Sequence, residues 1–361
     1  MAYTTIDDPS AHFQAVNFAG NQTARTITFG GNSDLQGDLF WCKERNSAVN
    51  WHRVLDTSRG AETSSCPVIY SNSNAAETAH TSGAQIKVIG TNSVQIGTGQ
   101  GINTDSNEMS WWVWKANGGT RTTNTESGNN PGGGYQANTT AGFSIVDYVG
   151  TGAAGTMAHG LGAIPHLMII KNRPDIRDWR VYHKSYGAQK YLDLDTTAAL
   201  GDASTPFNDT DPTSSVFTVG SDGGSNDDGD NIIAYVWTEK QGYSKFGSYT
   251  GNGNANGPFV YTGFKPAWLL YKNVDSVSNW VMRDNKSTSG GGSNPNGTVL
   301  LANEPAAESV NDSATVIDLL SNGFKIRNTE NNDNTDDDDY IYAAFAHQPF
   351  VTSGGVPCTA H

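Results

Sequence analysis

Three copies of one motif follow one another along this 361-residue sequence, and they constrain its fold more than any other feature. Each copy begins with an aromatic residue shortly before a glycine turn, and an apolar stretch ending in lysine comes next. The three lysines are Lys43, Lys171 and Lys272. Such internal self-similarity indicates repeated structural units that pack against one another. We therefore predict three units.

Aromatic residues recur at two further positions in each copy. A tryptophan stands eight residues after each lysine and opens an alternating stretch typical of a hairpin strand. Each copy closes with a strand that is apolar on both faces, such as 109–114, and that needs cover from the partner sheet and from a neighbouring unit or subunit. The predicted core residues of the repeat are Trp51, Trp179, Trp280, Trp114, Trp237 and Phe345.

Composition favours short strands over helices. The chain contains 41 glycines, and aromatic residues make up 10% of it. Large rings bury enough surface to offset the ordering of a turn-rich chain. Each copy also offers several short stretches of strand periodicity separated by turn signals. We predict an all-β fold of three tandem antiparallel β-sandwich units, jelly-roll or lectin-like, with little helix.

The repeat divides the chain into six parts. The first two lysines are farther apart than the last two because a Gly-, Asn- and Thr-rich stretch with the composition of a flexible linker lies between them. We expect the N-terminal arm to anchor the protein and the three units to fold without it. The predicted parts are the arm 1–17, repeat 1 at 18–117, the linker 118–142, repeat 2 at 143–246, repeat 3 at 247–350 and a C-terminal tail 351–361.

Charge and hydropathy argue against two classes of partner. The formal net charge is −14, which repels a phosphate backbone, so nucleic acid is not an expected partner. No apolar run approaches the roughly 20 residues of a membrane helix, so we expect no membrane insertion.

The N-terminus lacks the features of a secretory signal, which favours folding in a cytosol. An odd number of cysteines, three, favours free thiols over a disulfide framework.

The common catalytic motifs are not found in the sequence. It contains no Gly-Xaa-Ser-Xaa-Gly, no His-Glu-Xaa-Xaa-His and no P-loop, and its histidines do not recur from copy to copy. We therefore predict no catalytic residue, no cofactor-binding residue and no enzyme activity. The repeated lysines are interpreted as strand-end cations that pair with a carboxylate and lie over a Trp ring, in preference to an anion site.

Acidic residues gather just before the closing strand of each copy. Carboxylate oxygens are ligands that calcium prefers, although the spacing here matches no EF-hand. A solvated, self-repelling loop is the favoured interpretation, and calcium binding is the alternative. The candidate calcium ligands are Asp227, Asp228, Asp230, Asp336 and Asp338.

Several segments resemble a family of repeat-containing proteins from marine tailed bacteriophages, including phages of cyanobacteria and of SAR11-type bacteria. They include Gly-Leu-Gly-Ala-Ile-Pro at 160–165, Trp-Arg-Val-Tyr-His at 179–183 and Gly-Tyr-Ser-Lys-Phe-Gly-Ser-Tyr-Thr-Gly-Asn-Gly at 242–253. Units two and three match best, and the likeness covers nearly the whole chain. The resemblance implies a virion structural component, fibre-like or surface-exposed, and it brings no catalytic residues.

These observations together predict a non-enzymatic virion structural protein that is synthesised in the host cytoplasm. It is expected as a tail fibre or appendage, or as a fibre or decoration on the capsid. Its expected partners are other virion proteins and further copies of itself, because single units would expose aromatic strands. A trimer is favoured, as the resemblance to phage appendages implies. The alternative is a lectin-like adhesion protein that binds a host-surface glycan. A glycan depolymerase ranks below both, since cleavage needs two carboxylates suitably placed across a groove.

Overall fold

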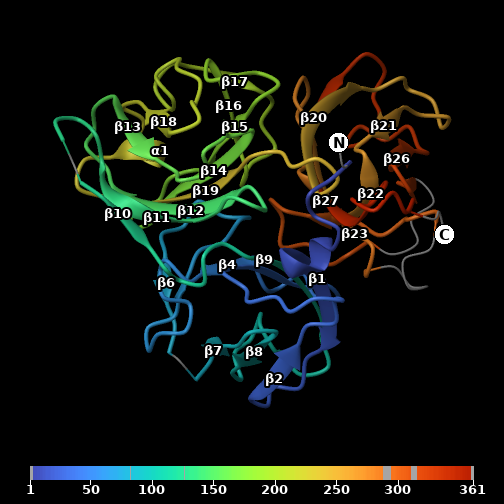
Figure 1. Ribbon diagram of the computed structural model, residues 1–361, viewed down its shortest axis with the longest axis horizontal. Helices are drawn as coiled ribbons and strands as arrows, with labels where there is room; N and C mark the ends of the chain where they lie inside the picture. The colour runs from blue at the N-terminus through green and yellow to red at the C-terminus, as the bar shows by residue number, and fades with distance from the viewer. Residues whose placement is uncertain (1–2, 82, 126, 288–293, 310–314, 359–361) are drawn as a thin grey trace.

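The computed structural model describes residues 3–81, 83–125, 127–287, 294–309 and 315–358. In this part the chain is all-β, with antiparallel sheets and almost no helix. The sheets group into three units that follow one another in sequence and surround a common centre (Figure 1). The prediction of an all-β fold in three units is confirmed. No helix in the described ranges is long and apolar enough to cross a bilayer.

Unit one contains a four-stranded sheet in the order β1-β9-β3-β4, a three-stranded sheet β2-β8-β7 and the pair β5-β6. A short 3-10 helix, η1 (Pro9–Ala11), precedes β1. The strand bounds are β1 (Phe13–Ala19), β2 (Arg25–Thr28), β3 (Leu39–Glu44), β4 (Arg53–Asp56), β5 (Pro67–Val68), β6 (Thr78–Ala79), β7 (Ile86–Ile89), β8 (Ser93–Ile96) and β9 (Glu108–Trp114).

Unit two has the largest sheet, eight strands in the order β10-β11-β12-β19-β14-β15-β16-β17, and the pair β13-β18. One helical turn, α1 (Gly223–Asn226), lies before the closing strand. The strand bounds are β10 (Thr122–Asn124), β11 (Gly132–Asn138), β12 (Phe143–Val149), β13 (Gly155–Ala158), β14 (Leu167–Asn172), β15 (Arg180–His183), β16 (Lys190–Asp193), β17 (Gly201–Asp202), β18 (Val216–Val219) and β19 (Asn231–Trp237).

Unit three contains a five-stranded sheet β20-β27-β22-β23-β24 and a three-stranded sheet β21-β26-β25. The strand bounds are β20 (Ser244–Thr250), β21 (Phe259–Tyr261), β22 (Phe264–Asn273), β23 (Val281–Asp284), β24 (Leu300–Leu301), β25 (Ile317–Leu320), β26 (Gly323–Ile326) and β27 (Asp339–Pro349).

Each unit has its own apolar core on one face of its large sheet. Side chains alternate between the two faces of a strand, so every second residue of the closing strand points into this core. In unit one these residues include Trp111 and Val113 of β9, and they pack with Phe40 of β3. Units two and three have equivalent cores around β19 and β27.

The other faces of the three large sheets share a fourth core at the centre of the molecule. The last aromatic residue of each closing strand lies there: Trp114, Trp237 and Phe345. The ring centroid of Trp114 lies 6.2 Å from that of Trp237 and 5.5 Å from that of Phe345. The centroids of Trp237 and Phe345 are 6.5 Å apart. The expectation that neighbouring units cover these strands is therefore confirmed.

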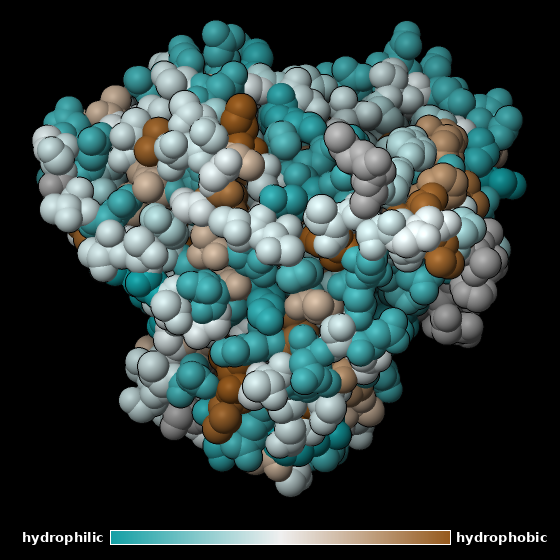
Figure 2. Space-filling model, in the orientation of Figure 1, coloured by the Kyte–Doolittle hydropathy of each residue, from teal (hydrophilic) through white to brown (hydrophobic). Residues whose placement is uncertain are grey.

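Because the aromatic strands are covered within one chain, they do not require a second copy to bury them. Exposed aromatic strands are therefore no longer a reason to expect self-association. The oligomeric state stays a prediction. The face of the molecule in Figure 2 is mostly hydrophilic, and its apolar residues form separate small spots. Cys42, Cys66 and Cys358 all lie in the described ranges, and no disulfide joins any of them.

The predicted N-terminal arm differs from the structure. Phe13 begins β1, and it lies with Ile6 in the central core, where the Phe13 and Phe345 rings stack at 5.3 Å. Thr4 Oγ1 donates a hydrogen bond to the carbonyl of Gln241 at 2.8 Å, close to unit three. Deletion of the first 17 residues would thus remove part of the shared core, so we no longer expect the units to fold unchanged without them.

The predicted linker and the predicted boundary between units two and three also differ from the structure. The linker contains β10 and β11, which extend the sheet of unit two beyond β12. Its glycines are accommodated in a paired strand because β11 lies against β12 over its whole length. The boundary after residue 246 falls inside β20, so the two units meet between β19 and β20 instead.

Candidate functional site

The hairpin after the repeated lysine is one residue longer in unit one than in the other two units. Cys42 is paired with Arg53, Ile170 with Arg180 and Tyr271 with Val281. The residue just before these partners is His52, Trp179 or Trp280. His52, and not Trp51, is therefore the structural equivalent of the two tryptophans.

Trp51 was predicted as a core residue, and this prediction is wrong. Its surface is 41% exposed, whereas Trp179 and Trp280 are buried. The extra loop residue shifts Trp51 out of the interface. At its outer position the Trp51 ring lies edge-on to that of Tyr70, with 5.2 Å between the ring centroids. His52 takes the buried place.

This repeated position joins each unit to the preceding one around a closed ring. Trp179 Nε1 of unit two donates to the carbonyl of Tyr70 in unit one at 3.0 Å. Trp280 Nε1 of unit three donates to the carbonyl of Asp193 in unit two at 2.9 Å. His52 of unit one faces the backbone of Leu301 in unit three, although its Nε2 makes no hydrogen bond of normal geometry.

The His52 ring is neutral. Its Nδ1 accepts a hydrogen bond from Trp41 Nε1 at 3.1 Å, which places the ring proton on Nε2. Burial, followed by the charge of Lys43, holds the pKa of His52 well below its usual range. A neutral imidazole can occupy a place that an indole fills in the other two units.

Backbone hydrogen bonds close the same ring. A donor at one repeated position meets a carbonyl at another, and all three contacts are made between successive units. The contacts are Glu77 N to Arg173 O at 2.7 Å, Leu200 N to Val274 O at 2.8 Å, and Glu308 N to Arg45 O at 2.6 Å. In two of these contacts the side chains also form an ion pair, Glu77 with Arg173 and Glu308 with Arg45. In the third, both side chains are apolar.

The three repeated lysines are buried at these interfaces. Lys171 Nζ donates to the carbonyl of Asn74 in unit one at 3.2 Å. Lys272 Nζ donates to the carbonyl of Thr197 in unit two at 3.3 Å. Lys43 Nζ donates to carbonyls within its own unit, including that of Ser47. Burial lowers the pKa of each lysine to about 8.

The predicted pairing of these lysines with a carboxylate over a Trp ring is therefore wrong. The sequence could not reveal that β3, β14 and β22 end at an interface between units. An ammonium group has three donors, and carbonyls satisfy them where water is excluded.

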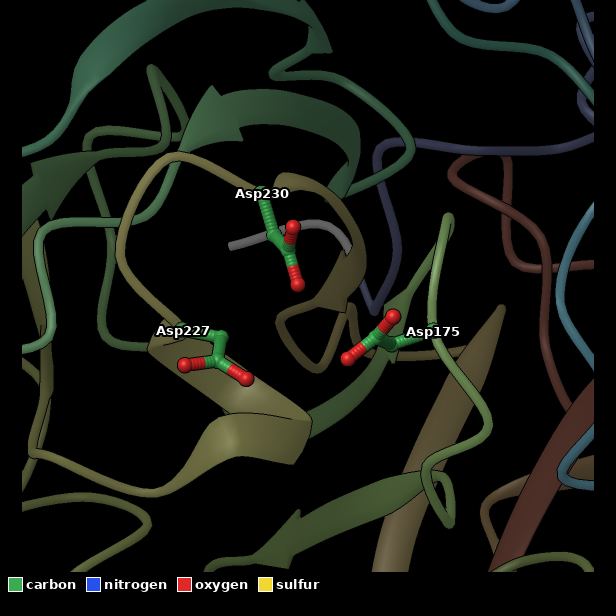
Figure 3. A group of neighbouring side chains, drawn as sticks. All are labelled: Asp175, Asp227 and Asp230. Atoms are coloured by element: carbon green, nitrogen blue, oxygen red, sulfur yellow. The ribbon is translucent and has the colours of Figure 1, made fainter.

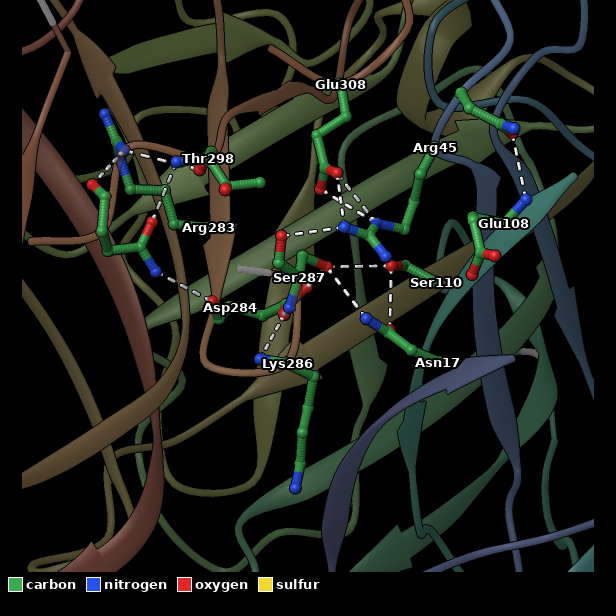
Figure 4. A network of polar contacts seen from close by, with 12 residues as sticks. Asn17, Arg45, Glu108, Ser110, Arg283, Asp284, Lys286, Ser287, Thr298 and Glu308 are labelled. Carbon is green, nitrogen blue, oxygen red and sulfur yellow. Dashed lines mark hydrogen bonds and ion pairs between the residues drawn. The ribbon is translucent and has the colours of Figure 1, made fainter. Parts of the chain in front are cut away.

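The interface between units one and three carries an extended polar network (Figure 4). Arg45 binds Glu308 at 2.6 Å and donates to the carbonyl of Ser287 at 2.8 Å. The hydroxyls of Ser287 and Ser110 lie 3.0 Å apart. Asn17 of β1 donates to the Ser287 hydroxyl at 3.3 Å. These contacts fix the loop after β23 against β1 and β9.

Two further repeated positions shape the start and the end of each unit, and the sequence analysis missed the first of them. One is a fully buried asparagine five residues before each closing strand: Asn103, Asn226 and Asn334. The other is the glycine of each opening turn: Gly20, Gly150 and Gly251. A Cβ on each of these glycines would lie 2.0 Å from the carbonyl oxygen of the residue after that asparagine.

Each buried asparagine ties the opening turn to the segment that follows β8, β18 or β26. For example, Asn226 Nδ2 donates to the carbonyls of Ala153 and Gly220, both at 2.7 Å, while its Oδ1 accepts from Thr151 N at 2.9 Å. The constant distance of the asparagine from the closing strand is the signal that could have found it.

The calcium candidates fall into two groups. Asp227 and Asp230 come together with Asp175, which the sequence analysis missed, and carboxylate oxygens of the three lie within 4.8 Å of one another (Figure 3). Arg177 already binds Asp227 at 2.6 Å, and Asn172 donates to Asp230 at 2.8 Å. These contacts account for the acidic cluster without a metal.

The remaining calcium candidates are not brought together with a third ligating side chain in the described part of the chain: Asp228, Asp336 and Asp338. Asp338 accepts hydrogen bonds from Asn273 Nδ2 at 2.7 Å and from Ser276 Oγ at 2.8 Å. Asp338 and Asp230 are equivalent residues, each directly before a closing strand and each bonded to the asparagine after the repeated lysine. Calcium binding stays a prediction.

Two hollows lie outside the repeated positions. A groove of about 370 Å³ runs along β1 between units one and three, and Ala15, Asn17, Gly30, Lys286 and Ala346 are among its lining residues. A smaller hollow of about 240 Å³ lies beside the exposed ring of Trp51 and includes Arg53 and Tyr70.

Comparison with known proteins identifies the family but no characterised relative. No curated protein matches the chain, and no solved structure matches it. Residues 8–349 match a family described as a domain of unknown function, DUF7483. Because this match spans all three units, the chain belongs to the DUF7483 family.

Proposed function

We propose that the chain is a non-enzymatic structural protein of a bacteriophage virion, synthesised in the host cytoplasm. It would serve as a surface-exposed tail fibre or appendage, or as a fibre or decoration on the capsid. The phage assignment rests on the resemblance of the repeat segments to virion proteins of marine tailed phages. Other virion proteins are the proposed partners.

One observation carries the structural role. The residues that recur in the three units are used for contacts inside the chain, at the centre, at the interfaces between units or at the opening turns. Lys171 and Lys272 bind carbonyls of the preceding unit, as do Trp179 and Trp280. A repeat whose recurring residues hold the units together favours a scaffold over a repeated catalytic site.

Mass spectrometry and gel densitometry of purified virions test this proposal. Detection of the chain in stoichiometric amounts is expected, and a copy number set by the shell would favour a capsid decoration over a tail appendage. Its absence from purified particles would contradict the proposal. Light scattering tests the proposed oligomer, and a species of 38.5 kDa alone would count against it.

Binding of a host-surface glycan is the second candidate, and Trp51 is the observation that favours it. Its half-exposed ring borders a hollow that also contains Tyr70 and Arg53. An exposed aromatic face beside polar donors suits the apolar face of a sugar.

A glycan array with wild-type protein and the variant Trp51→Ala tests this candidate. Glycan signals that the variant loses would support it, and an array without signals would contradict it. A reducing-end assay on host polysaccharide separates simple binding from cleavage by a depolymerase.

A further inference from the structure

The outer edge of β1 is unpaired. In the sheet order β1-β9-β3-β4, no described strand lies beyond β1. His12 and Gly20 flank β1, and they form backbone hydrogen bonds with Lys115 and Asn107, the residues that flank β9. Backbone direction alternates along an antiparallel strand, so the N–H and C=O groups of Ala15 and Asn17 point away from β9. They point to the side of β1 along which the groove runs.

The equivalent edge in unit two is filled by the chain itself. There β11 pairs with β12 in antiparallel register, with Gln136 opposite Ile145 and Gly134 opposite Asp147. Phe13 and Phe143 occupy the same place against the last tryptophan of their closing strands. Ile145 and Asp147 are therefore the equivalents of Ala15 and Asn17.

The surroundings of β11 and of the groove are also equivalent. Gln136 donates to the hydroxyls of Thr57 and Ser58 in unit one, both at 2.7 Å, and Asn138 donates to the carbonyl of Lys115 at 3.1 Å. By the pairing of β4 and β23, and of β9 and β27, these three residues correspond to Asn285, Lys286 and Ala346 of unit three. All three line the groove beside β1.

In unit three, ion pairs span the corresponding place. Glu239 binds Lys184 of unit two at 2.8 Å and Lys245 of β20 at 2.7 Å. The place beside the first strand therefore differs among the three units. A strand of the same chain fills it in unit two, ion pairs span it in unit three, and a groove of about 370 Å³ remains in unit one.

We propose that the groove beside β1 is a strand-addition site, in which an extended segment of another protein pairs antiparallel with β1. A long unpaired edge strand is a template for backbone pairing, and main-chain hydrogen bonds then supply affinity while side-chain pockets supply specificity. The proposal concerns the partner's chemistry at this edge and does not depend on the virion assignment.

The strand β11 defines the chemistry of the segment that fits. β11 has three small residues at Gly132–Gly134 and an amide side chain at Gln136 that reaches across to the neighbouring unit. In the groove, Asn285 and Lys286 lie where Thr57 and Ser58 bind Gln136, so the equivalent side chain of a bound strand would face them. The partner segment is therefore an uncharged strand of about six residues, small at one end and with an amide side chain opposite Ala15.

A synthetic peptide with the sequence of residues 131–138, Pro-Gly-Gly-Gly-Tyr-Gln-Ala-Asn, is the probe. Titration calorimetry or fluorescence anisotropy with the full-length chain should show binding to one site. In β11 the N–H groups at positions 134 and 136 point to the partner strand, whereas those at 133 and 135 point away. N-methylation at 134 and 136 should abolish binding, and N-methylation at 133 and 135 should leave it unchanged.

A protein variant locates the site. Gly30 lines the groove, and a Cβ on it would have no atom within 4 Å, so Gly30→Phe is chosen to place a ring in the groove. We expect it to weaken peptide binding at least about tenfold, which is about 1.4 kcal/mol. Gly83→Phe is the matched control, because Gly83 also faces open space and does not line the groove. Circular dichroism checks that both variants fold like the wild type.

Three results would overturn the proposal. The first is absence of peptide binding to the wild-type chain. The second is equal binding by the two N-methylated peptides or by the two glycine variants. The third is a self-associated wild-type chain that Gly30→Phe converts to a monomer, since a second copy would then be the occupant of this edge.

Discussion

Buried polar residues at the interfaces between units fix how the units dock. Lys272 has no exposed surface, yet its ammonium group is satisfied by the carbonyls of Thr197 and Asn273 and by the Ser278 hydroxyl. A buried charge of this kind costs free energy unless every donor has a partner. Such residues specify how the units dock more than they stabilise the fold.

His52 and Trp51 should respond oppositely to truncation. His52→Ala leaves a cavity and an unpaired Trp41 indole in the interface, so we expect a loss of about 2–4 kcal/mol in unfolding free energy. Trp51→Ala removes a half-exposed ring and should cost less than about 1 kcal/mol. Urea denaturation measures both. A larger loss for Trp51→Ala than for His52→Ala would contradict the equivalence of His52 with Trp179 and Trp280.

Lys272 should make the stability of the protein depend on alkaline pH. Burial lowers its pKa from 10.5 to about 8, so between these values the unfolded chain binds more protons than the folded chain. The contribution of Lys272 to stability is therefore full above about pH 10.5 and is lost as the pH falls through 8.

The variant Lys272→Met isolates this contribution. The difference in unfolding free energy, wild type minus variant, should rise from pH 8 to pH 10. The exposed Lys87→Met serves as the matched control for the change of lysine to methionine. A flat difference for Lys272→Met would mean that Lys272 titrates normally in the folded chain.

At the scale of elements, the opening turn and the closing strand of each unit are built together. The turn glycine approaches a carbonyl too closely to carry a side chain, and the buried asparagine holds that carbonyl's segment in place. The closing strand then begins in register with the first strand, as in the pairing of β12 with β19.

Gly150→Ala tests this construction. Its Cβ would lie 2.0 Å from the backbone oxygen of Asp227, so the turn or α1 must shift, and we expect a loss of about 1–3 kcal/mol or more. Gly30→Ala is the control, since the added methyl group meets open space. Thermal melts should show a clear drop in Tm for Gly150→Ala only. Equal melting temperatures would show that the close approach is absent in solution.

The elements were largely predictable because the repeat kept its order, and the closing strand expected at 109–114 begins only one residue earlier, at Glu108. Two errors have a physical cause. One extra residue in the loop of unit one places Trp51 one position before the structural equivalent of the other two tryptophans. A shift of one residue along a strand turns each side chain to the opposite face of the sheet. The strand β11 was taken for a linker because its glycines weaken strand propensity, whereas pairing with β12 determines its conformation.

The contacts of the buried lysines were beyond sequence reasoning for a similar cause. Lys171 and Lys272 each have one carbonyl partner in the preceding unit, for example Asn74 for Lys171, about a hundred residues earlier in the chain. A periodic motif shows that units are alike, but it does not show how they dock.

At the scale of the whole molecule, the three units depend on one another. The central core draws residues from all three large sheets, and Trp114, Trp237 and Phe345 meet there. Backbone contacts at the three interfaces close a ring, so the loss of one unit would expose apolar surface on the other two. We therefore expect the chain to unfold as one body rather than as three independent domains.

Native-state hydrogen exchange of wild type and Phe345→Ala tests this central claim most directly. The substitution lies in unit three, and β3 and β14 belong to units one and two. A shared core predicts that the slowest-exchanging amides of β3, β14 and β22 all lose the same protection, by about 3–5 kcal/mol in opening free energy. A loss of protection confined to β22 and its unit would contradict the account.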